Sequence, residues 1–154
     1  MMNNLFGALK TILLSVSILF IFSSSDSSEG PALCTDPIIL PNDPPSCPAG
    51  RFLTQQEIPT RNACGSENGW NFPDNPLGFE FTDACNAHDQ CYGTCGKSKD
   101  ECDAEFKDNM LSACVDSASE AACALLAVAY HEAVVVKGTD PFKDAQKKYC
   151  RCCV

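Results

Sequence analysis

Residues 85–106 read CNAHDQCYGTCGKSKDECDAEF, and this stretch is the most informative part of the chain. His88, one of two histidines in the protein, is followed directly by Asp89. Asp103 comes fifteen residues after His88, next to Cys102, and further cysteines flank both acids. A base, a cation ligand and an acid able to orient the base are the side chains of a hydrolytic site. The stretch therefore predicts such a site, held in place by crosslinks.

Capping residues and breaks predict two helices here, over residues 82–94 and 98–114. Thr82 or Asp83 can cap the first helix, and a glycine follows its end. Ser98 begins a Ser-x-x-Glu capping box that opens the second helix. Because the connection between them is short, the two helices should run antiparallel.

A third, strongly apolar helix is expected over residues 117–137, where Ser117 begins a second Ser-x-x-Glu box. Its apolar side chains are suited either to packing on the first two helices or to spanning a membrane. His131 and Glu132 within it favour packing. An Asp-Pro pair at 140–141 begins a short last helix, and no strand pattern is evident, so we expect an all-α fold.

The chain divides by composition into three segments. Residues 1–25 carry one charge, Lys10, before an apolar run over 12–22, which is typical of a secretory signal and short for a membrane span. Residues 26–60 hold seven of the ten prolines and should form an extended arm, either a pro-segment or a strap. Residues 61–154 are expected to form the folded domain.

The cysteine content indicates the cellular compartment, and the net charge excludes some classes of binding partner. Twelve cysteines behind a signal indicate a disulfide framework in a secreted protein. The closest cysteines have no histidine nearby, which disfavours zinc. A net charge of −9 repels nucleic acid and gains nothing from anionic lipid, so a membrane partner should be zwitterionic or held by apolar contacts. We expect a monomer.

Helical geometry selects the partner of His88. His88 and Asp89 are adjacent, so their side chains diverge by about 100° and address different neighbours. Five acids crowd the second helix, but only Asp103 shares the inward face with Phe106 and Met110. An inward carboxylate needs a hydrogen-bonding partner, and His88 is the obvious one. The alternative is a buried pair with a purely structural role.

The motif C-x-x-H-D-x-C-Y at 85–92 resembles the active-site helix of secreted phospholipase A2. The continuation over 95–106 is similar to atypical members with a short connection between helices, and to microbial relatives. The resemblance covers roughly residues 62–114. It implies a disulfide-stapled fold with two antiparallel active-site helices, and a phospholipase A2-like catalytic domain over 61–154. The alternative in a different class is a non-catalytic lipid- or receptor-binding module on the same scaffold.

The resemblance also implies roles for individual residues. His88 matches the general base that takes a proton from water, and Asp103 matches the acid that orients it. Tyr92 matches the tyrosine that donates a hydrogen bond to this acid. Residues 62–65 resemble the start of the calcium loop, whose backbone carbonyls complete the shell of the ion. The calcium ligands implied are Asp89, Ala63 and Gly65. The expected reaction is calcium-dependent hydrolysis of the sn-2 ester of glycerophospholipids.

Two crosslinks are expected around this site. Cys64 lies in the loop that must approach the active-site helix, and Cys85 lies one turn before the histidine, so we expect a Cys64–Cys85 bond. The family resemblance implies Cys91–Cys102, with Cys95–Cys102 as the local competitor. All twelve cysteines should be oxidised.

The expected partner is a phospholipid membrane surface or micelle. Trp70 and Phe72 lie near the proposed site and are candidates for apolar anchors, with core packing as the alternative.

Overall fold

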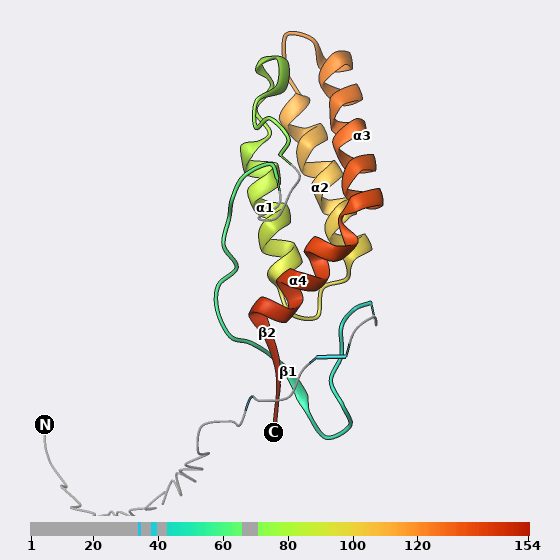
Figure 1. Ribbon diagram of the computed structural model, residues 1–154. Coiled ribbons are helices and arrows are strands. Elements are labelled where there is room, and N and C mark those ends of the chain that lie inside the picture. Colours follow the sequence, from blue (N-terminus) through green and yellow to red (C-terminus); the bar gives the residue numbers. More distant parts are fainter. Residues whose placement is uncertain (1–33, 35–37, 40–42, 66–70) are drawn as a thin grey trace, which may run out of the picture. The chain divides into compact units, whose positions relative to one another are not determined.

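The structure is a computed structural model of the chain, drawn in Figure 1. The chain splits into two units, residues 1–30 and 31–154, and the description concerns the second unit alone. The described residues are 34, 38–39, 43–65 and 71–154. The predicted signal over 1–25 and the candidate anchor Trp70 therefore lie outside the described residues.

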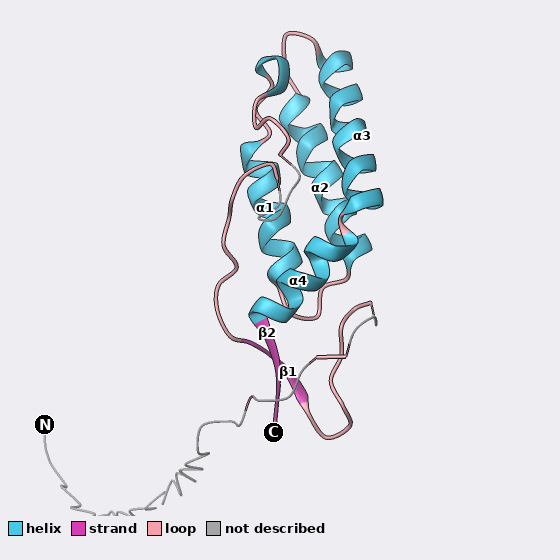
Figure 2. Ribbon diagram, in the orientation of Figure 1, coloured by secondary structure: helices cyan, strands magenta, loops and turns pink. Residues whose placement is uncertain are grey.

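Four α-helices dominate the described part of the chain, which confirms the mainly helical fold class. They are α1 (Thr82–Gly93), α2 (Lys99–Cys114), α3 (Glu120–Lys137) and α4 (Thr139–Tyr149), with a short 3-10 turn at Pro76–Gly78. The helices α1, α2 and α3 lie side by side, and α4 crosses one end of them (Figures 1 and 2). The antiparallel course of α1 and α2 agrees with the short connection between them.

The helix α2 begins at Ser98, the N-cap residue of the predicted capping box. The Ser98 Oγ accepts a hydrogen bond of 3.1 Å from the backbone N–H of Glu101. The Asp43 Oδ1 accepts a second one, of 3.0 Å, from the backbone N–H of Lys99. The start of α2 is therefore satisfied from within the helix and from the arm.

The predicted start of α3 is wrong. The helix begins at Glu120 with Ser119 at its N-cap, and the Ser117 Oγ is buried without a hydrogen-bond partner. A disulfide closes the turn between Cys114 and Cys123, and Asp116 lies in the left-handed region with φ 64°. This crosslinked turn sets the start of α3 and overrides the cap favoured by local sequence.

A two-stranded sheet is the feature that the sequence analysis missed. The strands β1 (Phe52–Gln55) and β2 (Cys150–Cys153) pair antiparallel, with Phe52 opposite Cys153 and Gln55 opposite Cys150. Each strand has only four residues. The pair joins the arm to the end of the chain, so no local pattern announces it.

Six disulfides join all twelve cysteines. Both expected bonds around the site, Cys64–Cys85 and Cys91–Cys102, are present. The competitor Cys95 bonds instead to Cys150. The remaining bonds are Cys34–Cys153, Cys47–Cys152 and Cys114–Cys123. Two of them tie Cys34 and Cys47 of the proline-rich arm covalently to β2.

The main core lies between α1, α2 and α3. Its largest buried side chains include Phe81, Phe106, Met110 and Tyr130. Phe72 packs against this core, with its ring centroid 4.9 Å from that of Tyr130, so the structure favours core packing over a membrane anchor at this position.

The apolar helix α3 packs on α2 through one face. Its outer face exposes Leu125, Val128, Val135 and Val136. Among the described residues, no single helix has the length and apolarity needed to cross a membrane. Within the described ranges, the pair α3 and α4, with a 70° bend between them, meets that test of length and composition when taken together.

Candidate active site

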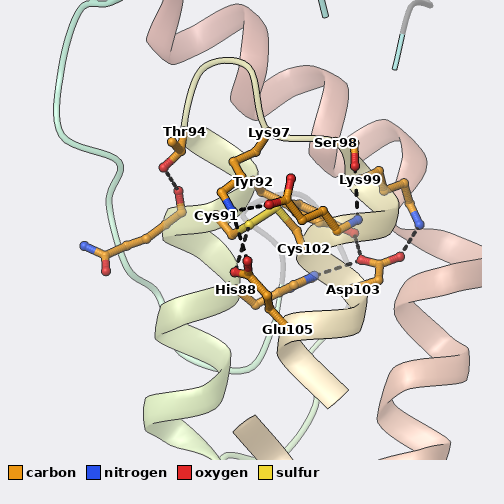
Figure 3. The surroundings of a disulfide bond; sticks show 12 residues. His88, Cys91, Tyr92, Thr94, Lys97, Ser98, Lys99, Cys102, Asp103 and Glu105 are labelled. Atoms are coloured by element: carbon orange, nitrogen blue, oxygen red, sulfur yellow. Dashed lines mark hydrogen bonds and ion pairs between the residues drawn. A yellow bond between two sulfur atoms is a disulfide. The ribbon is translucent and has the colours of Figure 1, made fainter. Parts of the chain in front are cut away.

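His88 of α1 and Asp103 of α2 meet in the interior of the molecule. The His88 Nε2 lies 3.0 Å from the Asp103 Oδ1. Figure 3 marks this contact between the two side chains with a dashed line. The two residues are 8% and 2% exposed. The Cys91–Cys102 disulfide ties their helices together beside the pair. This histidine and this acid are therefore in hydrogen-bond contact, as the helical phase of Asp103 predicted.

The surroundings of His88 keep its ring neutral. Burial lowers the pKa of His88, and this outweighs the hydrogen bond and charge of Asp103, which raise it. The ring lies between Tyr92 and Phe106, with centroid distances of 4.0 and 4.5 Å. Because a carboxylate can only accept, the neutral ring donates from Nε2 and leaves Nδ1 free to take a proton.

Asp103 receives three donors. The Tyr92 hydroxyl donates to Oδ1 over 2.7 Å, and the Lys99 ammonium donates to Oδ2 over 2.5 Å. Burial alone would raise the pKa of Asp103, but the hydrogen bonds from His88, Lys99 and Tyr92 outweigh it and lower the pKa. Burial and the Asp103 carboxylate raise the pKa of Tyr92, so its hydroxyl stays a donor. Asp103 is therefore an ionised acceptor in a buried site.

Sequence reasoning missed Lys99. This lysine stands next to a helix cap, where lysines are usually exposed, yet it is 8% exposed. The signal was present in the spacing, because Lys99 and Asp103 are four residues apart on one helix face.

The other four acids of α2 are exposed, as helical phase predicted. They are Asp100, Glu101, Glu105 and Asp108. Lys97 bridges two of them, with Nζ 2.5 Å from Glu101 Oε1 and 2.9 Å from Glu105 Oε1.

Asp89 faces the loop of residues 62–65. The Asp89 Oδ2 accepts a hydrogen bond of 2.8 Å from the backbone N–H of Asn62. The next residue, Ala63, has φ 62° and donates its N–H to Asn86 Oδ1 over 3.1 Å. The Cys64–Cys85 bond completes the attachment, so the loop is held against α1 at the position of Asp89.

His88 and Asp89 open onto one pocket of about 440 Å³. Its wall includes Ala63 and Gly65 from the loop. The apolar part of the wall includes Phe72, Phe106, Tyr130, Ala133 and Val134. The base, the neighbouring carboxylate and an apolar lining therefore share one space, which suits a substrate with an apolar body and a polar reacting group.

The oxygen atoms available near Asp89 are of the kind that bind a hard cation. Among the residues that the structure describes, no three His, Cys, Asp or Glu side chains gather into a metal site. Beside the loop, the pocket instead offers the carboxylate of Asp89, which accepts from the Asn62 N–H, and the backbone of residues 62–65. Carboxylate and carbonyl oxygens are ligands typical of calcium, whereas structural zinc sites use Cys and His.

Residues 46–154 match the model of a family described as "Group XII secretory phospholipase A2 precursor". The chain belongs to this family. This agrees with the resemblance found in residues 85–106 and extends it through α3, α4 and β2.

Individual relatives match a shorter part. The chain is 37% identical over 79 residues to Group XIIA secretory phospholipase A2 of Homo sapiens, which is 47% of this chain and 42% of the relative. It is 39% identical over 80 residues to the Mus musculus Group XIIB secretory phospholipase A2-like protein, covering 47% and 41%. The chain thus spans less than half the length of these relatives. No solved structure matches it significantly.

Proposed function

We propose that the protein is a secreted, calcium-dependent phospholipase A2. It hydrolyses the sn-2 ester of glycerophospholipids and releases a fatty acid and a lysophospholipid. The observation that carries this proposal is the buried His88–Asp103 pair, which shares a pocket with Asp89 and the loop of residues 62–65. Membership of the family supports the reaction class.

The residues of the chain divide the chemistry between them. The Nδ1 of His88 accepts a proton from water as the oxygen attacks the ester carbonyl. Asp103 and Tyr92 hold the ring and stabilise the imidazolium that forms. Calcium, held by Asp89 with the carbonyls of Ala63 and Gly65, would polarise the ester and stabilise negative charge on its oxygen. No covalent intermediate with the protein is required.

The proposed setting is the surface of a zwitterionic membrane or a micelle outside the cell. The relatives are named secretory, and six disulfides suit an oxidising compartment. A net charge of −9 disfavours anionic lipid and nucleic acid. We expect the protein to act as a monomer.

The test measures fatty-acid release from phosphatidylcholine vesicles labelled at the sn-2 position. We expect release with calcium and none after chelation. Asp89→Asn should lose both activity and calcium binding measured by calorimetry. Asp83→Asn, an exposed acid on the same helix, is the matched control and should behave like the wild type.

Two results would contradict the proposal. Full release in the presence of a chelator would exclude the role of calcium. Vesicle binding without release, by a folded protein in calcium, would instead identify a lipid-binding module.

A further inference from the structure

Lys99 is a buried cation that the proposed reaction does not itself use. Its Nζ lies 2.5 Å from Asp103 Oδ2 and donates to the Val135 carbonyl of α3 over 3.3 Å. A buried ammonium needs hydrogen-bond acceptors, and these two take up two of its three N–H donors. Lys99 therefore links Asp103, the acid of the His88–Asp103 dyad, to α3.

The neighbouring Lys97, which lies just before α2 and pairs with its exposed acids, shows what an ordinary exposed lysine does. Both lysines pair with a carboxylate four residues further on. The side chain of Lys97 is 32% exposed, whereas that of Lys99 is 10% exposed. Exposed pairs of this kind contribute little, because water screens them. The matched pair isolates the effect of burial beside the dyad.

The two oxygens of Asp103 have separate donors. Oδ1 accepts from His88 and Tyr92, and Oδ2 accepts from Lys99. A carboxylate can rotate about its Cβ–Cγ bond, so donors on one oxygen alone do not fix its plane. The Lys99 ammonium fixes the second oxygen and thereby holds Oδ1 in front of the ring.

Close packing at the junction of α3 and α4 keeps these donors in place. A Cβ added at Gly138 would lie 2.3 Å from the Tyr92 hydroxyl and 3.2 Å from Lys99 Cε. The φ of Gly138 is −76°, which any residue adopts, so contact and not backbone conformation requires a glycine. The third helix therefore ends against both donors that flank the dyad.

We propose that Lys99 is a positioning residue for the His88–Asp103 pair. Its ammonium holds Oδ2, so that Oδ1 accepts from Nε2 and the ring keeps the tautomer with a bare Nδ1. The catalytic consequence of this role rests on the proposed function, whereas the structural consequence does not.

The kinetic test compares Lys99→Met with Lys97→Met. Lys99→Met should lower kcat by about 10- to 100-fold, the range found when an orienting partner is lost, and leave KM unchanged. Lys97→Met should leave both unchanged. Lys99→Arg, which keeps the charge, should recover most of kcat. In an Asp103→Asn background, Lys99→Met should cause no further loss, because its effect passes through that acid.

A second measurement does not depend on turnover. Spectra of ¹⁵N-labelled histidine, assigned with His88→Gln, report which ring nitrogen carries the proton. The wild type should show His88 protonated at Nε2 alone, and Lys99→Met should show a mixture of tautomers. If Lys99→Met does not fold, Lys99→Gln, which keeps a hydrogen-bonding amide without charge, replaces it in both measurements.

The outcomes separate this inference from the proposed function. A wild type that releases no fatty acid refutes the function, and the tautomer measurement still decides the role of Lys99. A single Nε2 tautomer in the folded variant refutes the positioning role. The positioning role is also refuted if Lys99→Met lowers kcat equally in the wild-type and Asp103→Asn backgrounds, because such a loss indicates a general structural effect.

Discussion

Two crosslinked regions of the molecule differ in how far apart their bonded cysteines lie in the sequence. In the site, Cys64–Cys85 and Cys91–Cys102 join residues only 21 and 11 positions apart. The second region, which we call the clamp, consists of β1, β2 and the arm, joined by Cys34–Cys153, Cys47–Cys152 and Cys95–Cys150. Those bonds span 119, 105 and 55 positions.

The difference separates two tasks. The bonds in the site fix the position of groups that are already close in sequence, and helix geometry does the rest. The bonds in the clamp close long loops, which removes more conformational freedom from the unfolded chain. The site should therefore respond to mutation mainly in rate, and the clamp mainly in stability.

The largest expected effect is on stability, from removing two clamp bonds together. Replacing Cys47 and Cys152 by serine leaves Cys34–Cys153 in place, so only a ring of about 15 residues opens, at a cost of about 3 kcal/mol. Replacing Cys34 and Cys153 as well opens a loop of about 50 residues, bounded by Cys95–Cys150, and costs about 4 kcal/mol more. Denaturant unfolding of both variants measures the two steps.

The control is removal of the local Cys114–Cys123 bond, which should cost about 2.5 kcal/mol. Equal costs for the two steps in the clamp would mean that the bonds act independently of loop size. Loss of activity in the folded four-serine variant, assayed well below its unfolding midpoint, would contradict the separation between clamp and site.

The second effect is on rate, from Asp103→Asn. The amide keeps the shape but favours the wrong tautomer of His88, so kcat should fall on the order of 10²–10⁴. The loss should be smaller than for His88→Gln if Tyr92 keeps the site assembled. Release of sn-2 fatty acid measures both variants.

Glu105→Gln is the matched control, since Glu105 is an exposed acid two residues from Asp103. It should cost almost nothing. A loss at Glu105 equal to that at Asp103 would show that the helix does not present Asp103 to the ring in solution.

The same contrast explains what the sequence could predict. Periodicity within one helix placed His88 and separated Asp103 from four other acids, because both judgements depend on neighbours a few residues away. The cap at Ser98 was also local and is present, with the Ser98 Oγ accepting from the Glu101 N–H. The start of α3 failed because a crosslinked turn, and not Ser117, sets it.

Features that depend on distant segments could not be found in this way. The strands β1 and β2 are four residues long and lie about a hundred positions apart, so neither has a pattern of its own. The buried position of Lys99 depends on the end of α3 packing over it. Its spacing from Asp103 was visible, but burial had to come from the third helix.

The third prediction tests that packing. In Gly138→Ala the new methyl group would meet the Tyr92 hydroxyl and the Val134 carbonyl, and both must shift. We expect kcat to fall about tenfold or more, since a misplacement of 1 Å can cost on the order of 10². Gly50→Ala is the control in the arm. Gly50 has φ 80° and open space around it, so alanine should cost about 1–2 kcal/mol of stability and leave kcat unchanged. If Gly138→Ala and Gly50→Ala lowered kcat equally, close contact at Gly138 would not be the cause of its effect on rate.

The smallest expected effect is a shift in the pH at which kcat/KM declines on the acid side, which we call the acid limb. Burial lowers the pKa of His88 below its ordinary value of 6.5, against the raising effect of Asp103, and the charges of Lys99 and His131 add to the lowering. The ring is the active base only when neutral, so activity should persist as pH falls through 6.5 and decline at the lowered pKa. A calcium ion on Asp89 would shift the limb in the same direction.

Stability should follow a different course over that window. Between the lowered pKa and 6.5 the unfolded chain binds a proton at His88 and the folded protein does not, so stability falls as pH falls while activity is retained. Asp103 has a lowered pKa and stays ionised throughout, so it adds no change there. Lys99→Met removes one lowering charge and should move the acid limb to higher pH, whereas Lys97→Met should not. A limb above pH 6.5 in the wild type would mean that pairing with Asp103 outweighs burial, and the site would then behave like an exposed ion pair.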